Sequence, residues 1–192
     1  MAIADKTLTG RRVALAPFAR EHLDDPAYLS WLRDYEVIKT LNLPDYWSPV
    51  PIERVRAYVE GLWASSQDMF FAITVVDGSI FAGTLRLARI DRRTKSADIG
   101  IMIGRRELWG KGLATEAIAL ALRHVFDDLG LRRATAGLMA GNIGMAKVFE
   151  KNGFVLEGRF REQDPTREGE YSDHLHYGCL RTDFEAARKR TT

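Results

Sequence analysis

The residues best suited to chemistry form a short glycine-containing loop, Trp109-Gly110-Lys111-Gly112-Leu113-Ala114. Where such a loop opens a helix, several backbone N–H groups point towards one spot, because the first N–H groups of a helix have no partner within it. The helix dipole adds partial positive charge there, and Lys111 adds a full charge at the rim. Gly110 and Gly112 lack the Cβ atoms that would hold a ligand away from the backbone. The loop is suited to a phosphate or pyrophosphate group, although ordinary turn chemistry would explain the same glycines.

The segments on either side of the loop are expected to be a strand and a helix. Residues 97–103 alternate apolar and polar side chains, which predicts a strand, and residues 115–129 carry apolar residues at helical spacing. The loop is neither a G-x-x-x-x-G-K-[ST] motif nor a G-x-G-x-x-G motif with an acidic residue about 20 positions later. Two common nucleotide-binding loops are therefore excluded.

The loop resembles the coenzyme A pyrophosphate loop of the GNAT superfamily of acetyl-CoA-dependent N-acetyltransferases, Q/R-x-x-G-x-G/A. Gly112 and Ala114 fill its last two fixed positions, and Trp109 replaces the usual Gln or Arg. The longer match W-G-K-G-x-A-T-E-A, at residues 109–117, is similar to the branch that acetylates ribosomal-protein N-termini and various small amines.

Composition indicates an ordinary globular protein. The chain has 192 residues, 46% of them hydrophobic and 28% charged, and its net charge is only +2, so bulk electrostatics do not favour nucleic acid as a partner. The single cysteine, Cys179, excludes an internal disulfide framework and fits a reducing compartment. No apolar run approaches the roughly 18 residues of a membrane span, and no signal-peptide core is visible. We expect a cytoplasmic protein with no membrane or nucleic-acid partner, either a monomer or a homodimer.

The predicted order of elements is strand, two helices, three strands, helix, strand, helix and two strands. The clearest local signal is a hairpin, with strands at 70–76 and 80–90 joined by Asp77-Gly78. Residues 35–50 are irregular in spacing and are expected to form a loop. The resemblance implies the same layout, an α/β (α+β) GNAT-like fold whose central, mixed, mostly antiparallel twisted sheet has about seven strands flanked by helices. We expect one acetyltransferase domain over residues 1–192, with a few frayed residues at each end.

The resemblance also implies where the coenzyme lies. Backbone groups near Met102 and Ile103 would pair with the pantetheine amides as a strand edge pairs with an added strand. A second family signature, a helix that begins with Asn142 and ends in Gly153-Phe154, would add Asn142 and, more weakly, Lys147; Asn142 is equally suited to a purely structural helix cap. The implied contacts at the loop itself are Trp109, Gly110, Lys111, Gly112, Leu113, Ala114 and Thr115.

Two positions depart from the family pattern. Many members carry Tyr where this chain has Phe149, and ribosomal-type relatives often have Ser where it has Met145; both are thought to protonate the leaving thiolate. Neither residue present can donate a proton. Solvent could serve, because a thiol has an ordinary pKa of about 8.5 and its thiolate leaves readily.

The implied reaction is direct attack of an amine on the thioester, for which a base is useful because alkyl amines are mostly protonated at neutral pH. Asp98 and Asp164 are alternative bases, and each could equally be an ordinary surface or turn aspartate. His174 and His176 would share a strand face, but without a third ligand at suitable spacing we expect no metal. The expected acceptor pocket comprises Trp31, Tyr35, Trp47, Tyr171 and His174, with core packing as the competing interpretation of Trp31.

The sequence thus predicts an N-acetyltransferase that uses acetyl-CoA as cosubstrate and needs no metal. The acceptor would be a small-molecule amine or a protein N-terminus. The alternative, suggested by Phe149 and Met145, is a non-catalytic acyl-CoA sensor or binding partner.

Overall fold

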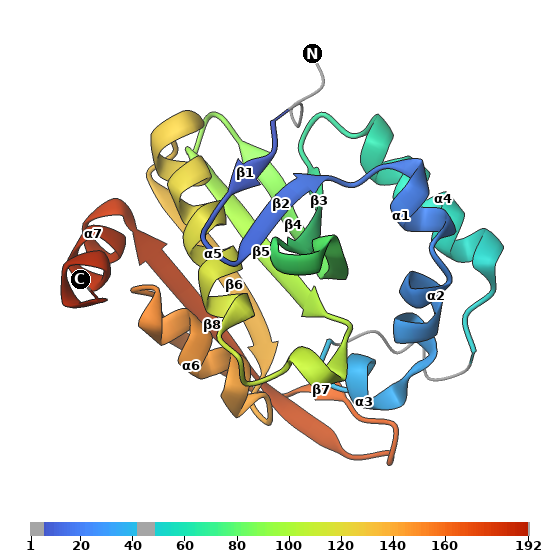
Figure 1. Cartoon of the computed structure of the whole chain (residues 1–192). Helices are drawn as coiled ribbons and strands as arrows, with labels where there is room; N and C mark the ends of the chain where they lie inside the picture. Colours follow the sequence, from blue (N-terminus) through green and yellow to red (C-terminus); the bar gives the residue numbers. More distant parts are fainter. Residues whose placement is uncertain (1–5, 42–48, 192) are drawn as a thin grey trace.

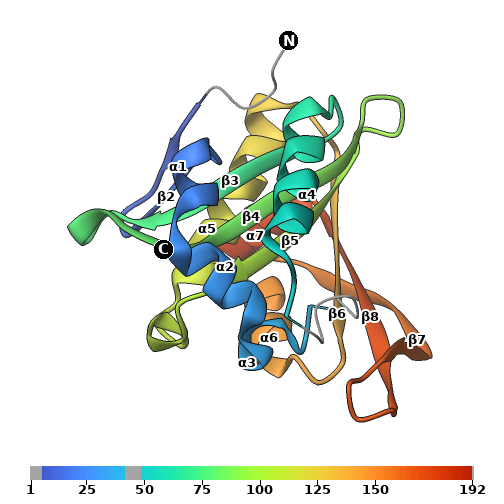
Figure 2. The same ribbon diagram turned by 90° about the vertical axis from the view of Figure 1, so that its right-hand side faces the viewer.

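The computed structural model describes residues 6–41 and 49–191. They form one eight-stranded sheet, ordered β1-β2-β3-β4-β5-β6-β8-β7, with helices on both faces (Figures 1 and 2). Neighbouring strands are antiparallel except for β5 and β6, which are parallel. The strands are β1 (Leu8–Thr9), β2 (Val13–Pro17), β3 (Met69–Val75), β4 (Ile80–Asp91), β5 (Ser96–Ile103), β6 (Arg133–Met139), β7 (Val155–Pro165) and β8 (Tyr171–Leu180).

Two apolar clusters separate the helices into layers. The larger cluster packs α5, α6 and α7 against one face of the sheet, and the smaller one packs α1 to α4 against the other face at the β2–β5 end (Figure 1). Alternation along β5 serves both clusters, since Ala97 and Ile99 belong to the first and Met102 to the second. The helices are α1 (Arg20–Asp24), α2 (Pro26–Arg33), α3 (Tyr35–Ile38), α4 (Ile52–Ala64), α5 (Leu113–Arg123), α6 (Ile143–Lys151) and α7 (Arg181–Thr191).

The parallel pair β5 and β6 stays together for only three register pairs, from Ser96 opposite Arg133 to Asp98 opposite Thr135. Beyond Asp98 the two strands have no further register pairs. Because β6 continues along β8 up to Met139, the sheet stays paired on that side. Within the part of the chain that the structure describes, the β6-facing edge of β5 therefore has no strand paired to it from Ile99 onwards.

The element order and the GNAT-like fold predicted from the sequence are confirmed, with local corrections. The predicted loop at 35–50 begins instead with a turn of helix, α3, because the Asp34 side chain accepts a hydrogen bond from the N–H of Glu36 and caps it. The two-residue strand β1 adds an eighth strand. The predicted long helix ends as α5 at Arg123, and the chain continues through a π-helical turn, His124–Asp128.

Within the described ranges, every helix is too short or too polar to cross a bilayer.

Candidate active site

The loop between β5 and α5 has the backbone geometry that its glycines suggest. After the 3₁₀ turn η3 (Arg106–Leu108), Gly110 has φ +72° and Gly112 has φ +76°, and α5 begins directly at Leu113. These left-handed conformations are strained for residues with a Cβ atom. The first helical N–H groups, from Leu113 onwards, have no intrahelical acceptor and stay available to a ligand.

Arg12, just before β2, braces this loop from behind. Its guanidinium donates hydrogen bonds to the carbonyl oxygens of Lys111 (2.8 Å) and Gly112 (3.2 Å). A trans peptide holds its C=O and N–H on opposite sides. Fixing those two carbonyls on Arg12 therefore turns the N–H groups of Gly112 and Leu113 the other way, towards the open side of the loop.

Glu116 completes the brace. Its carboxylate accepts hydrogen bonds from the backbone N–H of Arg12 (2.8 Å) and from the Arg12 side chain (3.0 Å). Burial alone would raise the pKa of the Glu116 carboxyl, but these hydrogen bonds outweigh it and hold the pKa below its ordinary value. Arg12 could not be predicted from the sequence, because its partners lie about 100 residues away along the chain.

Trp109 anchors the start of the loop. Its indole N–H donates to the carbonyl oxygen of Ile103 (2.8 Å), and the guanidinium of Arg106 lies over its ring. This hydrogen bond ties the start of the loop to the last residue of β5.

A cleft of about 130 Å³ lies where β5 and β6 part. The cleft is smaller than the roughly 300–1,000 Å³ pockets that enclose drug-sized ligands, so it can hold the reacting end of a substrate but not a whole coenzyme. The lining residues are Thr40, Leu41, Ile99, Gly100, Ile101, Gly137, Leu138, Met139, Asn142, Met145, Phe149 and His174.

Asn142 lines the cleft and also caps α6. Its Oδ1 accepts from the N–H of Met145 (3.1 Å), and its Nδ2 donates to Thr40 Oγ1 (3.0 Å). The cap interpretation is confirmed, and the amide also ties α6 to the residues after α3. Met145 and Phe149 both line the cleft, which is therefore apolar where relatives place a hydroxyl group.

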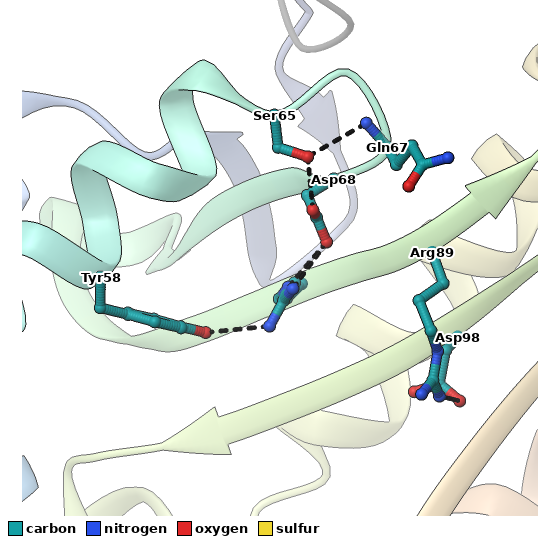
Figure 3. Close-up of polar contacts among 7 residues, drawn as sticks. Tyr58, Ser65, Gln67, Asp68, Arg89 and Asp98 are labelled. Atoms are coloured by element: carbon teal, nitrogen blue, oxygen red, sulfur yellow. Dashed lines mark hydrogen bonds and ion pairs between the residues drawn. The ribbon is translucent and has the colours of Figure 1, made fainter.

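Asp98 is engaged in structure rather than exposed to the cleft. Its carboxylate forms an ion pair with Arg89 (2.9 Å; Figure 3) and accepts a hydrogen bond from Thr135 Oγ1 (2.8 Å). These contacts tie β4, β5 and β6 together at the last register pair before β5 and β6 part. Asp98 is not among the residues that line the cleft.

Asp164 and His174 lie together. Asp164 is fully buried (0% exposed), and its carboxylate is 2.6 Å from His174 Nδ1. His174 lines the cleft. The sequence singled out both residues but not their contact, which depends on the way β7 bulges against β8.

The remaining predicted pocket residues that the structure describes lie apart from the cleft. Trp31 is buried against Phe81 and Gly104 in the smaller core cluster. The phenol of Tyr35 donates to Glu168 (2.6 Å) and so joins α3 to the β7–β8 turn. Tyr171 is 65% exposed. Trp47 falls outside the described residues.

Lys147 faces a second hollow of about 370 Å³ between α6 and α7, which it lines with Glu150, Lys151, Ala187 and Arg190. In the described parts of the chain, no three His, Cys, Asp or Glu residues are grouped closely enough to hold a metal ion.

Known proteins resemble this chain in sequence or in fold. "Probable N-acetyltransferase YjcK" of Bacillus subtilis is 31% identical over 153 residues, covering 79% of this chain and 83% of YjcK. The structure of spermidine N-acetyltransferase from Vibrio cholerae in complex with CoA and spermine has a TM-score of 0.80 at 20% identity, covering 91% of this chain and 98% of that one. RimL, a ribosomal L7/L12 alpha-N-protein acetyltransferase in complex with coenzyme A, has a TM-score of 0.79 at 20% identity, covering 91% and 98%.

The loop geometry fits a coenzyme of this kind, since its left-handed glycines and outward N–H groups form a cradle for a pyrophosphate. The family model described as "Acetyltransferase (GNAT) domain" matches residues 12–155, from the arginine that braces the loop to the start of β7. The chain belongs to the GNAT family of N-acetyltransferases.

Proposed function

We propose that this enzyme moves an acetyl group from acetyl-CoA to a primary amine by direct attack in a ternary complex. The observation that carries the proposal is the loop at Gly110 and Gly112, whose N–H groups are turned outwards by Arg12 beside the cleft between β5 and β6. The coenzyme would supply the activated acetyl thioester. Residues 110–115 would hold its pyrophosphate, and the free edge of β5 near Met102 would hold its pantetheine arm.

Two other residues have proposed roles in holding the coenzyme. Asn142 lines the cleft, and its cap contact with Met145 fixes the orientation of its amide. Lys147, with Lys151 and Arg190, gives the hollow beside α6 an excess of positive charge that suits the coenzyme's phosphates.

For the acceptor, we propose a small primary amine such as a polyamine, with a protein N-terminus as the alternative. The two structural neighbours named above act on these two classes. The small volume of the cleft accommodates the end of an alkyl amine. A flexible peptide would present the same group and place the rest of its chain near α3 and the β7–β8 turn.

The test measures thiol release from acetyl-CoA against spermidine, spermine, amino sugars, amino acids and short peptides, beside calorimetric titration with coenzyme A. We expect tight coenzyme binding and release that depends on one acceptor class. Coenzyme binding without release on any amine would favour the sensor, to which the apolar Met145 and Phe149 point. Absence of coenzyme binding would contradict the proposal itself.

A further inference from the structure

Among the twelve described residues that line the cleft, His174 alone has an ionisable side chain. Asp98 and Asp164, the two carboxylates suggested by the sequence, do not line it. A proton leaving an amine in the cleft therefore meets an imidazole first.

The backbone conformation of β7 determines the position of Asp164, the hydrogen-bonding partner of the His174 imidazole. Between Phe160, opposite His174, and Asp164, opposite Ser172, β7 has two more residues than β8, and Glu162 takes a left-handed φ of +51°. Asp173 holds this bulge, because its carboxylate accepts from the N–H of Glu162 (2.8 Å). The bulge turns the carboxylate of Asp164 into the protein and onto His174 Nδ1.

The two ring nitrogens of His174 have different surroundings. Nδ1 is 2.6 Å from the buried Asp164 carboxylate, which accepts hydrogen bonds when ionised. The proton of the neutral ring is therefore assigned to Nδ1 and the lone pair to Nε2. Nε2 lies over Gly137, where an added Cβ atom would be only 2.3 Å away, and Gly137 itself lines the cleft.

We propose that His174 is the catalytic base and that Asp164 is its positioning residue. This inference rests on the proposed transferase function. As the amine nitrogen forms its bond to the acetyl carbon and the carbon–sulfur bond breaks, the proton on nitrogen moves to Nε2 of His174. The thiolate leaves with the electron pair of the broken bond and takes its proton from water. Asp164 stabilises the imidazolium that results.

Besides Asp164, His176 is an ionisable group in contact with the His174 ring. The centroid of its ring lies 4.9 Å away, on the same strand. The His176 ring packs edge-on against Phe160 and is not among the cleft residues. It provides a matched control, since it lies on the same face of β8 two residues further along.

The first experiment compares His174→Asn with His176→Asn, using spermidine and a short peptide as acceptors at saturating concentration. The Asn amide can still donate to Asp164 but has no counterpart of Nε2. We expect kcat to fall about 100-fold or more in His174→Asn, with little change in acceptor KM or coenzyme affinity. His176→Asn should keep near wild-type kcat. The deficit in kcat should narrow at high pH, where hydroxide can take the proton of the attacking amine in place of Nε2; an equal deficit at every pH would overturn the base assignment.

The second experiment determines which ring nitrogen of His174 carries the proton, in the absence of catalysis. Long-range ¹H–¹⁵N correlation spectra should show the neutral His174 ring protonated on Nδ1. Asp164→Asn should move that proton to Nε2, because the new amide can donate to Nδ1, and should lower kcat by at least about 100-fold. A proton on Nε2 in the unchanged protein would overturn the proposal.

The two proposals fail in distinguishable ways. A wild-type chain that binds coenzyme A but acetylates no amine overturns the transferase function, and the proton transfer with it. A wild-type chain that acetylates spermidine or the peptide while His174→Asn does so equally well overturns only the role of His174.

Discussion

At the scale of single residues, the side chains that shape the site are mostly occupied by structural partners. Arg12 is the clearest case, because it touches no part of the cleft yet fixes the direction of the loop's N–H groups through two carbonyl oxygens. Cys179 lies outside the site, and the larger core cluster encloses its thiol. Both lead to direct predictions.

Arg12→Gln should weaken coenzyme A binding about tenfold, because hydrogen bonds to a charged group contribute roughly 1.5–3 kcal/mol and the loop can relax without them. Calorimetric titration measures the change. Arg11→Gln is the matched control, since Arg11 is exposed and next in sequence. Equal affinities for the two variants would show that the glycines hold the loop unaided.

Cys179 should resist thiol reagents in the folded protein. Burial disfavours the thiolate and raises the pKa of this thiol to about 12, so almost none of the reactive form exists at pH 8. Ellman's reagent should label no thiol in the native protein and one thiol per chain in denaturant. Rapid labelling of the native protein would contradict the buried position.

At the scale of elements, polar contacts between side chains connect the ends of neighbouring strands and helices. Asp68 does this at the start of β3, where its carboxylate accepts from Ser65, after α4, and from Arg86 on β4 (2.7 Å) (Figure 3). Burial would raise the pKa of the Asp68 carboxyl, but these hydrogen bonds outweigh it and lower the pKa.

Asp68→Asn should lower the free energy of unfolding by about 1–2 kcal/mol at pH 7, since the Arg86 contact is partly screened by solvent. A lowered folded-state pKa gives stability that is present above the unfolded-state pKa and is lost as pH falls through the folded-state value. The deficit in unfolding free energy should therefore shrink as pH falls below about 3.9, the ordinary pKa of an aspartate. Urea denaturation at pH 7 and across this acid range tests this, with the exposed Asp77→Asn as control.

The β7 bulge depends on the hydrogen bond from Glu162 N–H to Asp173, a contact that, with Arg159, lowers the pKa of the Asp173 carboxyl. Asp173→Ala should speed amide hydrogen exchange at Glu162 by about tenfold or more, because that N–H loses its acceptor. Unchanged exchange would mean that the bulge is held by β7 itself.

The sequence predicted the elements better than their details. Apolar periodicity predicts the β3–β4 hairpin, α5 and the order of strands. These predictions hold because the apolar face of each element packs into one of the two clusters. The single turn α3 has too few residues to show a period. The Asp164–His174 contact needs two extra residues in β7, and nothing local in the sequence distinguishes a bulge from a regular strand.

At the scale of the whole molecule, the proposed coenzyme site combines backbone groups of the loop with the positively charged side chains of the hollow between α6 and α7. Lys147→Gln should weaken coenzyme A binding a few-fold at low salt and less at high salt. The reason is that the positive charge of Lys147 is exposed, so dissolved salt screens it. Calorimetry at low and high ionic strength tests this, with Lys95→Gln, in the β4–β5 turn, as control. A salt-independent effect would indicate packing instead of charge.

The parallel pair β5 and β6 is a single crossover unit set within an otherwise antiparallel sheet. In sheets built wholly from such units, ligands bind beyond the carboxyl ends of the strands, where neighbouring strands diverge. If the coenzyme binds main-chain atoms of β5 and its loop as proposed, the cleft side chains of β6, of β8 and of the residues after α3 are left for the acceptor. Substitutions among those side chains would then change the amine that is modified without changing the contacts that hold the coenzyme.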